Sequence, residues 1–333
     1  MNKETRFSVD SISNLKAIVY TEYGGPESLH HKEITNPIPK DDEVLIRVHA
    51  VSINDWDWGL LHGDFINRIL NGMFRPKRQI LGSDIAGRIE AVGKNVTRFK
   101  IGDEVYGDLS GRWGGFAEYV CATEKALALK PPRMSFVDAA AIPQAAMLAI
   151  QGLIDKGKIR EGQNLLINGA GGGVGSYGIQ IAKLYGVKVT GVDSNGKLDL
   201  MQSLGFDHVI DYEREDFTKN GKQYDLILDV KTNRSVFDYM RALNPNGTYA
   251  TVGGSLGRLL QIFLLGPLIS LFSKKKLLVV ALKTNKDLGY MNELFEAGKI
   301  KSVIHGPFPL NELPEAMEMF GKGEHRGKVV LTV

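Results

Sequence analysis

Cysteine is almost absent from this chain: its 333 residues include one, Cys121. A single cysteine excludes an intramolecular disulfide framework and fits the reducing environment of the cytoplasm. A strong charge of either sign is also missing, because 41 Lys and Arg stand against 38 Asp and Glu, for a net charge of +3. So small a surplus gives no reason to expect a nucleic-acid partner.

We expect neither a signal peptide nor a membrane span in this chain. Residues 1–15 mix acids with bases, so we expect a partly mobile tail there. Leu259–Phe272 is apolar, but it falls short of the roughly 20 residues that a span needs, and Gly266 and Pro267 interrupt it. It is interpreted as a core helix pair, a dimer or substrate-facing flap, or an interfacial membrane contact; the first two are favoured. We expect Lys274–Lys276 to form a solvated face.

The most informative stretch of what is present is residues 165–193. An apolar strand, Leu165–Asn168, leads into five glycines within seven residues. A helix follows, then a second strand, Val187–Val192, with Asp193 at its end. Strand, glycine loop, helix, strand and acid in this order are typical of a dinucleotide-binding unit.

Each part of this unit has a physical role in holding a dinucleotide. Gly172 and Gly175 allow backbone N–H groups to approach a pyrophosphate, and the helix presents its positive N-terminal end. Asp193 lies about 20 residues beyond, where an acid accepts hydrogen bonds from the adenosine ribose. The chain is therefore predicted to bind NAD(H) or NADP(H). The predicted pyrophosphate turn is Ala170, Gly172, Gly173, Val174 and Gly175.

Two kinds of pattern divide the chain. Before residue 130, short strand-like runs are separated by Gly, Pro and Asp. They are Lys16–Tyr20, Glu43–Ala50, Ala86–Val92, Ile101–Gly107 and Gly115–Val120. From Phe136 onward, strands and helices alternate, which predicts an α/β fold with a doubly wound parallel sheet. We expect the last part of the chain, from Asn292, to pack back on the N-terminal β domain.

Several motifs occur together: Tyr23–Glu27 (YGGPE), Ala50–Asp57 (AVSINDWD), Leu81–Gly87 (LGSDIAG), Gly102–Gly107 (GDEVYG) and Gly327–Val330 (GKVV). With the nucleotide loop, they resemble the medium-chain dehydrogenase/reductase superfamily, in its zinc-free quinone oxidoreductase and enone (alkenal) reductase branch. The resemblance implies a Rossmann domain, residues 139–284, inserted in a GroES-like catalytic domain, residues 16–138 and 285–333. It also implies a homodimer.

Metal ligands are missing where zinc-dependent relatives carry them. Those relatives need a Cys in the loop that is Ser52–Asp57 here and a His-Glu pair where this chain has Ser83 and Asp84. One cysteine cannot supply either of their tetrahedral sites. The seven histidines show no ligand spacing. We therefore predict no metal site.

Without zinc, removing a hydroxyl proton from an alcohol is difficult, whereas reducing an activated C=C bond needs no metal. The leading hypothesis is an NAD(P)H-dependent oxidoreductase that delivers hydride to quinones and α,β-unsaturated ketones or aldehydes. A zinc-independent alcohol dehydrogenase or aldehyde reductase is the second. A nucleotide-binding partner protein without turnover is the third.

The resemblance places Asn54 and Asp57 where the family has its Asn-x-x-Asp pattern. They either orient the nicotinamide ribose or a substrate carbonyl, or only brace their loop. The family's closest members often carry a lysine after the Asp-aromatic pair, but here Gly59 follows Trp58. That carbonyl donor is therefore missing, and the proton donor is left open.

Cofactor choice is undecided between NADH and NADPH. Asp193 would accept bonds from an unmodified ribose and repel a 2′-phosphate, unless an exposed side chain turns outward. By resemblance, Lys197 and Tyr212 match positions that clamp the 2′-phosphate, and Ser194 could join them. Gly253 and Gly254, after a later strand, either contact the nucleotide or only form a turn.

Overall fold

The computed structural model describes residues 14–333 and divides the chain into two compact units. Unit 1 takes the chain up to Pro143, then Gly306–Glu324 and Val329–Val333, and unit 2 takes Gln144–His305 and His325–Lys328. Of the predicted tail, residues 1–13 lie outside the described residues, and Asn14 and Leu15 already belong to a strand. The predicted domain boundaries remain a prediction; by compactness, residues 285–305 belong with unit 2.

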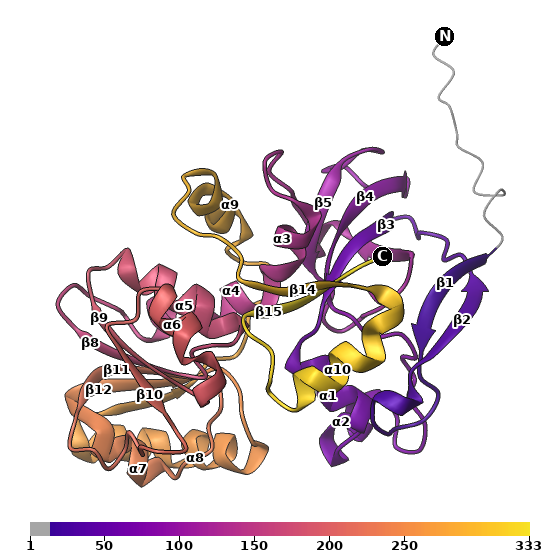
Figure 1. Cartoon of the computed structure of the whole chain (residues 1–333). Helices are drawn as coiled ribbons and strands as arrows, with labels where there is room; N and C mark the ends of the chain where they lie inside the picture. The colour runs from indigo at the N-terminus through magenta and orange to yellow at the C-terminus, as the bar shows by residue number, and fades with distance from the viewer. Residues whose placement is uncertain (1–13) are drawn as a thin grey trace. The chain divides into compact units, whose positions relative to one another are not determined.

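Unit 2 is built on a six-stranded parallel sheet (Figure 1). Its strands are β8 (Asn164–Asn168), β9 (Lys188–Asp193), β10 (His208–Asp211), β11 (Tyr224–Asp229), β12 (Leu243–Thr251) and β13 (Lys276–Val279). The spatial order is β10-β9-β8-β11-β12-β13, which in chain order reads 3-2-1-4-5-6. This is the strand order of the dinucleotide-binding Rossmann fold, so the predicted doubly wound sheet is confirmed.

Helices cover both faces of this sheet. The helices of unit 2 are α4 (Pro143–Ile150), α5 (Gly173–Lys183), α6 (Leu198–Ser203), α7 (Val236–Ala242), α8 (Leu256–Ser273) and α9 (Leu288–Glu296). Helices α5 and α6 lie on one side of the strands, and α7 and α8 lie on the other (Figure 1). Strands enclosed on both faces must be apolar throughout, and Leu165, Leu166 and Ile167 of β8 are all buried.

Unit 1 is mainly antiparallel. Its strands are β1 (Asn14–Val19), β2 (His30–Thr35), β3 (Glu43–Ser52), β4 (Asp84–Val92), β5 (Glu104–Asp108), β6 (Tyr119–Thr123), β7 (Ala128–Leu129), β14 (Ile304–Pro309) and β15 (Lys328–Thr332). Its helices are α1 (Asp55–His62), α2 (Phe65–Asn71), α3 (Phe136–Ala141) and α10 (Leu313–Gly321). Strands β1 and β2 pair with each other, and the main sheet runs β14-β15-β3-β4-β5-β7, with β6 beside β3. The sequence did not reveal β2, because its residues are polar and mostly exposed.

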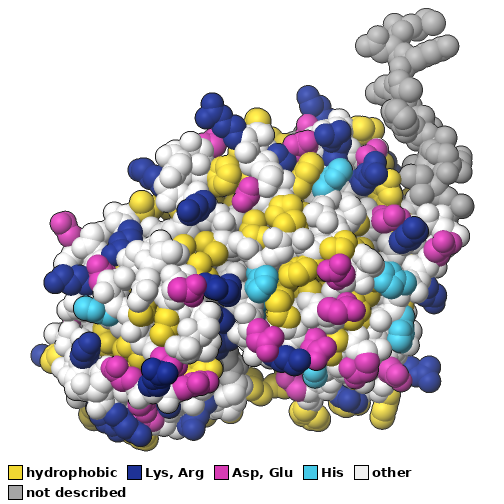
Figure 2. Space-filling model, viewed as in Figure 1, with side chains coloured by type: hydrophobic (Ala, Val, Ile, Leu, Met, Phe, Trp, Pro, Cys, Tyr) yellow, Lys and Arg dark blue, Asp and Glu magenta, His cyan; other side chains and the backbone are white. Residues whose placement is uncertain are grey.

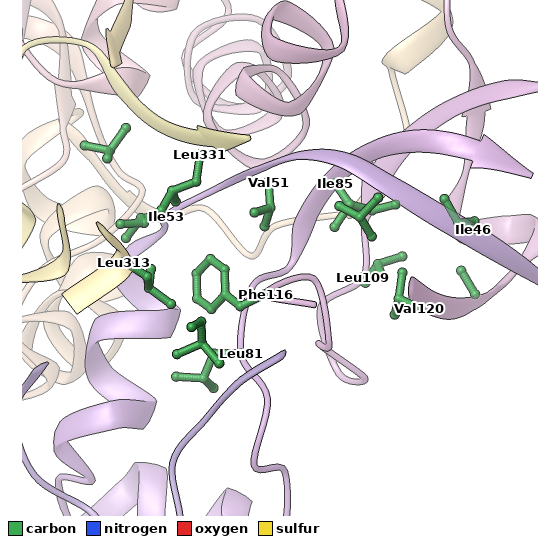
Figure 3. Close-up of a cluster of buried hydrophobic side chains, with 14 of the residues drawn as sticks. Ile46, Val51, Ile53, Leu81, Ile85, Leu109, Phe116, Val120, Leu313 and Leu331 are labelled. Atoms are coloured by element: carbon green, nitrogen blue, oxygen red, sulfur yellow. The ribbon is translucent and has the colours of Figure 1, made fainter. Parts of the chain in front are cut away.

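The core of unit 1 joins segments far apart in the chain (Figure 3). Phe116, which is fully buried, lies near Leu81 and Ile53, with Leu313 of α10 and Leu331 of β15 beside them. The expectation that the end of the chain packs back on the N-terminal domain is therefore confirmed for α10 and β15. It is wrong for α9, which belongs to unit 2.

The apolar run near residue 260 forms one helix, not the helix pair that its Gly-Pro interruption suggested. Helix α8 continues through Pro267, with Ile262 and Gly266 buried. A Cβ at Gly266 would lie 2.6 Å from the carbonyl oxygen of Leu277, so the helix packs closely on strand β13.

On the face shown in Figure 2, basic and acidic side chains are interspersed, in keeping with the small net charge.

Candidate functional site

The loop between β8 and α5 has the geometry of a pyrophosphate turn. Gly169 has φ +85°, a conformation that favours glycine, and it turns the chain at the end of the strand. A Cβ at Gly175 would lie 2.4 Å from the carbonyl oxygen of Ala170, so the helix begins in direct contact with the strand end. The predicted approach of Gly175 to the phosphate stays a prediction; the structure adds that the missing side chain of Gly175 also allows this packing.

The first turn of α5 provides the donors that a phosphate group needs. Gly172 is the N-cap, and its carbonyl oxygen accepts the N–H of Ser176. The N–H groups of Gly173, Val174 and Gly175 have no partner within the helix, because the first turn of any helix leaves its donors unused. They point along the positive end of the helix dipole, so this cradle fits the pyrophosphate of a dinucleotide.

Asp193 lies at the end of β9 and is buried, so it is not the exposed carboxylate that could turn away from a 2′-phosphate at little cost. Its Oδ2 accepts the N–H of Gly171 at 2.9 Å, and its Oδ1 accepts the N–H of Ser194 at 2.9 Å. Lys197 Nζ lies 3.3 Å from Oδ1, and both side chains are less than a tenth exposed. Asp193 thus ties the glycine loop to the end of the neighbouring strand, and its charge is matched by a lysine.

The other residues predicted for the adenosine end lie around this ion pair. The Lys197 side chain packs over the loop, since a Cβ at Gly171 would lie 2.7 Å from its Cδ. Burial lowers the pKa of Lys197, while the Asp193 carboxylate opposes that shift. Tyr212 is half exposed, and its backbone N–H donates to the carbonyl oxygen of Asp193. Ser194 is half-buried beside them.

Basic side chains surround the loop, and the sequence interpretation found only one of them, Lys197. A Cβ at Gly169 would lie 3.5 Å from Lys231 Cγ, and one at Gly173 would lie 3.1 Å from Lys328 Cδ. A Cβ at Gly172 would lie 3.7 Å from the Nε2 of His325. We call these four side chains the loop cluster: Lys197, Lys231, His325 and Lys328. Lys231 lies two residues after the end of the apolar strand β11, and this position at the carboxyl edge of the sheet could have revealed it.

His325 has an unusual environment for a histidine. It is buried, and the lysines of the loop cluster lie near it. Burial and the positive charges of Lys197, Lys231 and Lys328 lower its pKa to about 3. The imidazole is therefore neutral at pH 7.

The turn after β11 is fixed by a second buried carboxylate. Asp229 Oδ1 accepts the N–H groups of Lys231 and Thr232 and the side-chain amide of Asn168, each at 2.8–2.9 Å. Its Oδ2 accepts the hydroxyl of Tyr249 at 2.8 Å. This network holds the carboxyl ends of β8, β11 and β12 together, and it positions the backbone of Lys231.

Gly253 and Gly254 take part in this turn. The carbonyl oxygen of Gly253 accepts hydrogen bonds from the hydroxyls of Thr232 and Thr251. Gly254 has φ +118°, and a Cβ there would lie 2.4 Å from Thr232 Cβ. Their contacts support the turn role that the sequence left open beside nucleotide contact.

In unit 1, Asn54 and Asp57 form a buried polar group. Asp57 is fully buried; its Oδ2 accepts the N–H of Asn54 at 2.9 Å and its Oδ1 accepts the N–H of Gly82 at 2.9 Å. The Asn54 side chain donates to Ser83 Oγ at 3.1 Å. Of the two roles left open, these bonds favour the bracing role for Asp57. The side-chain amide of Asn54 is the group that the orienting role would use.

Neighbouring aromatic residues pack in the core of unit 1. Tyr106 is fully buried, and a Cβ at Gly321 would lie 1.9 Å from the Trp58 ring, so Trp58 is pressed against helix α10. Trp56, in contrast, is 45% exposed.

Among residues 14–333 no group of three or more His, Cys, Asp or Glu is placed to hold a metal ion.

Replacing Gly175 with alanine should damage the nucleotide site. The added Cβ would overlap the Ala170 backbone, so the helix start must shift, at a cost of about 1–3 kcal/mol. We expect at least a tenfold weaker affinity for reduced nicotinamide cofactor in a fluorescence titration. Gly196→Ala is the matched control, because a Cβ there has nothing within 4 Å. Equal affinity in both variants would contradict the packing role.

His325 should make stability depend on pH. Its folded pKa of about 3 lies below the ordinary value of 6.5, so unfolding takes up a proton between these values and stability falls as the pH drops below 6.5. The loss is about 1.4 kcal/mol per pH unit, or about 2–3 kcal/mol by pH 4.5. His325→Gln should remove this component. Denaturant unfolding of both proteins at pH 7 and pH 4.5 measures it, and identical pH slopes would refute the assignment.

Two family models match the chain. The model described as alcohol dehydrogenase GroES-like domain matches residues 40–132, within unit 1. The model described as zinc-binding dehydrogenase matches residues 204–331. That description belongs to the family; the predicted lack of zinc in this chain remains a prediction.

Relatives match over almost the whole chain. The 2-methylene-furan-3-one reductase of Solanum lycopersicum is 34% identical over 98% of this chain and 81% of its own length. A chloroplastic NADPH-dependent alkenal/one oxidoreductase of Arabidopsis thaliana is 32% identical, over 95% of this chain and 79% of its own length. The solved quinone oxidoreductase from Coxiella burnetii superposes with a TM-score of 0.85 at 27% identity, covering 96% of this chain and 99% of that one. With the glycine loop, the strand order and the GroES-like match already in place, this chain belongs to the medium-chain dehydrogenase/reductase superfamily, in the branch of the quinone oxidoreductases and alkenal/one reductases.

Proposed function

We propose that the protein reduces conjugated carbonyl compounds, meaning quinones and α,β-unsaturated ketones or aldehydes, with a reduced nicotinamide cofactor. The observation that carries the proposal is the cradle at Gly169–Gly175, whose contacts fit a dinucleotide pyrophosphate. The full-length relatives named for enone and quinone reduction support the choice of acceptor. When bound, the reduced nicotinamide supplies a hydride, which an acceptor polarised by its own conjugation can take without a metal.

The residues of this chain would then bind, orient and exclude water. The first-turn N–H groups of α5 and the lysines of the loop cluster hold the phosphates. Asp193 acts through the loop, by fixing the Gly171 N–H. In unit 1, we propose that the Asn54 amide orients the nicotinamide ribose or the substrate carbonyl and that Asp57 positions Asn54. Such a site depends on placement and a dry environment more than on one acid or base.

NADPH is the cofactor that we propose. The buried ion pair with Lys197 neutralises Asp193, so that carboxylate repels a 2′-phosphate less than an exposed one would. Lys197 and Tyr212 stand at this end of the sheet, and the Arabidopsis relative is named for NADPH. With the loop cluster nearby, positive charge exceeds negative charge around the nucleotide loop.

Two other functions remain as alternatives, and the assays described below distinguish them from the proposed one. A zinc-independent alcohol dehydrogenase or aldehyde reductase would use the same nucleotide loop. A non-catalytic nucleotide-binding partner protein would need that loop alone. Two further predictions are a homodimer, formed through an edge of the nucleotide-binding sheet, and a cytoplasmic location; the Arabidopsis relative is named chloroplastic.

A panel of acceptors tests the reaction. The oxidation of NADPH and NADH is followed with a quinone, a long-chain enal, an enone and a simple aldehyde. We expect turnover with the conjugated acceptors and at least about tenfold lower kcat/KM with the simple aldehyde, because only conjugation spreads the developing charge. Reduction of the simple aldehyde alone would favour the alcohol dehydrogenase alternative. No oxidation with any acceptor would favour the binding protein.

The ratio of the two KM values for NADPH and NADH tests the cofactor assignment. Loss of a charge-assisted bond costs about 1.5–3 kcal/mol, so Tyr212→Phe should raise the KM for NADPH about tenfold and leave the KM for NADH within about twofold. Lys231→Gln is the comparison, because a lysine beside the pyrophosphate turn should affect both cofactors alike. Equal effects of Tyr212→Phe on both cofactors would remove Tyr212 from the 2′-phosphate site.

A further inference from the structure

The outer face of helix α8 is apolar along its whole length. Seven large side chains on this helix are 53–84% exposed. They are Leu256, Leu260, Phe263, Leu264, Leu268, Leu271 and Phe272. Spacings of three and four residues place them on one side of the helix, and Pro267 between them is also exposed. An exposed apolar surface of this kind marks a site that something else covers.

The inner side of α8 is already occupied by its own unit. Ile262 and Gly266 are buried, and Gly266 allows the helix to approach the backbone of Leu277. Helix α8 is 18 residues long and apolar enough, by length and composition, to cross a membrane, and only 11% of it is buried within the protein. Since its inner side packs against β13, the helix is held along the surface of unit 2, an arrangement suited to lying in an interface.

Positive charge flanks the apolar face at both ends. Arg258 lies in the first turn, and Lys274, Lys275 and Lys276 follow the last turn. No Asp or Glu occurs between Leu256 and Lys276. Lys274 and Lys276 are exposed, whereas Lys275 donates to the carbonyl oxygen of Met240 at 2.7 Å. An apolar helix face bordered by lysines, with no acidic residue in the same segment, is typical of helices that bind anionic membrane surfaces.

A second copy of this chain fits the face less well. If two α8 helices paired antiparallel, Arg258 of each copy would meet the lysines at the other end of its partner. If they paired parallel, the two lysine clusters would meet. Either arrangement brings like charges together, which is unfavourable at a contact that excludes water. Anionic headgroups supply the opposite charge, and their acyl chains accept the apolar side chains.

We propose that the outer face of helix α8 docks on anionic lipid membranes. Its leucines and phenylalanines enter the boundary between headgroups and acyl chains, while Lys274 and Lys276 bind lipid phosphates. This inference does not depend on the proposed reaction, because membrane docking requires no turnover.

Flotation of the full chain with vesicles tests the proposal. One set contains phosphatidylcholine alone, and the other contains about one-third phosphatidylglycerol. We expect binding to the anionic vesicles, weakened at high salt, and at least fivefold weaker binding to phosphatidylcholine. Leu271→Glu should abolish flotation, and Lys276→Glu should weaken it about fivefold or more.

Matched exposed residues elsewhere serve as controls. Ile38 is 76% exposed and Leu271 is 75% exposed, so Ile38→Glu should float like the wild type. Lys222→Glu is the control for Lys276→Glu, since both lysines are exposed in unit 2. A denaturant unfolding transition like that of the wild type checks that each variant is folded.

Two results would overturn the proposal. The first is equal flotation of Leu271→Glu and the wild type. The second is a wild-type dimer in sedimentation velocity that Leu271→Glu dissociates, with no vesicle binding; this would assign the face to a second copy.

Discussion

The bond from the Gly171 N–H to the buried carboxylate of Asp193 holds the nucleotide site together. It joins the loop after β8 to the end of β9, and Lys197 compensates the carboxylate charge. A buried carboxylate without such partners would be costly and would take up a proton instead. The acid that the sequence assigned to the ribose is therefore first a structural element of the loop, and whatever it does for a ribose rests on that position.

A similar arrangement recurs at the other strands of the carboxyl edge. Asp229 gathers donors from three strand ends, as Asp193 gathers them from two. In a parallel sheet these ends meet at one edge, where backbone groups lose their ladder partners. Buried carboxylates that accept several N–H groups satisfy those donors and leave the turn rigid. The loop that faces the ligand is thus fixed before the ligand arrives.

The sequence predicted unit 2 well and unit 1 less completely, for physical reasons. Apolar strands such as Leu165–Asn168 must be hydrophobic throughout when helices cover both faces, so they stand out in the sequence. Strand β2, with the sequence HHKEIT, has mostly exposed side chains and carries no such pattern. His325 and Lys328 could not be placed beside the loop, because their contacts span more than 100 residues of chain and depend on the return of the C-terminal segment. The helix through Pro267 also escaped prediction, because tertiary packing against β13 outweighs the local cost of the proline.

The loop cluster shows how charge is prepared for an anionic ligand. Burial and neighbouring lysines lower the pKa values of His325 and Lys197, which means that these groups repel added positive charge in the free protein. The carboxylate of Asp193 offsets Lys197, while Lys231 and Lys328 add positive charge on the other sides of the loop. The negative charge of a phosphate placed among these side chains would attract their protons instead, and would raise the pKa values of His325 and Lys197. The positive potential is therefore held in place by the fold before an anionic ligand binds.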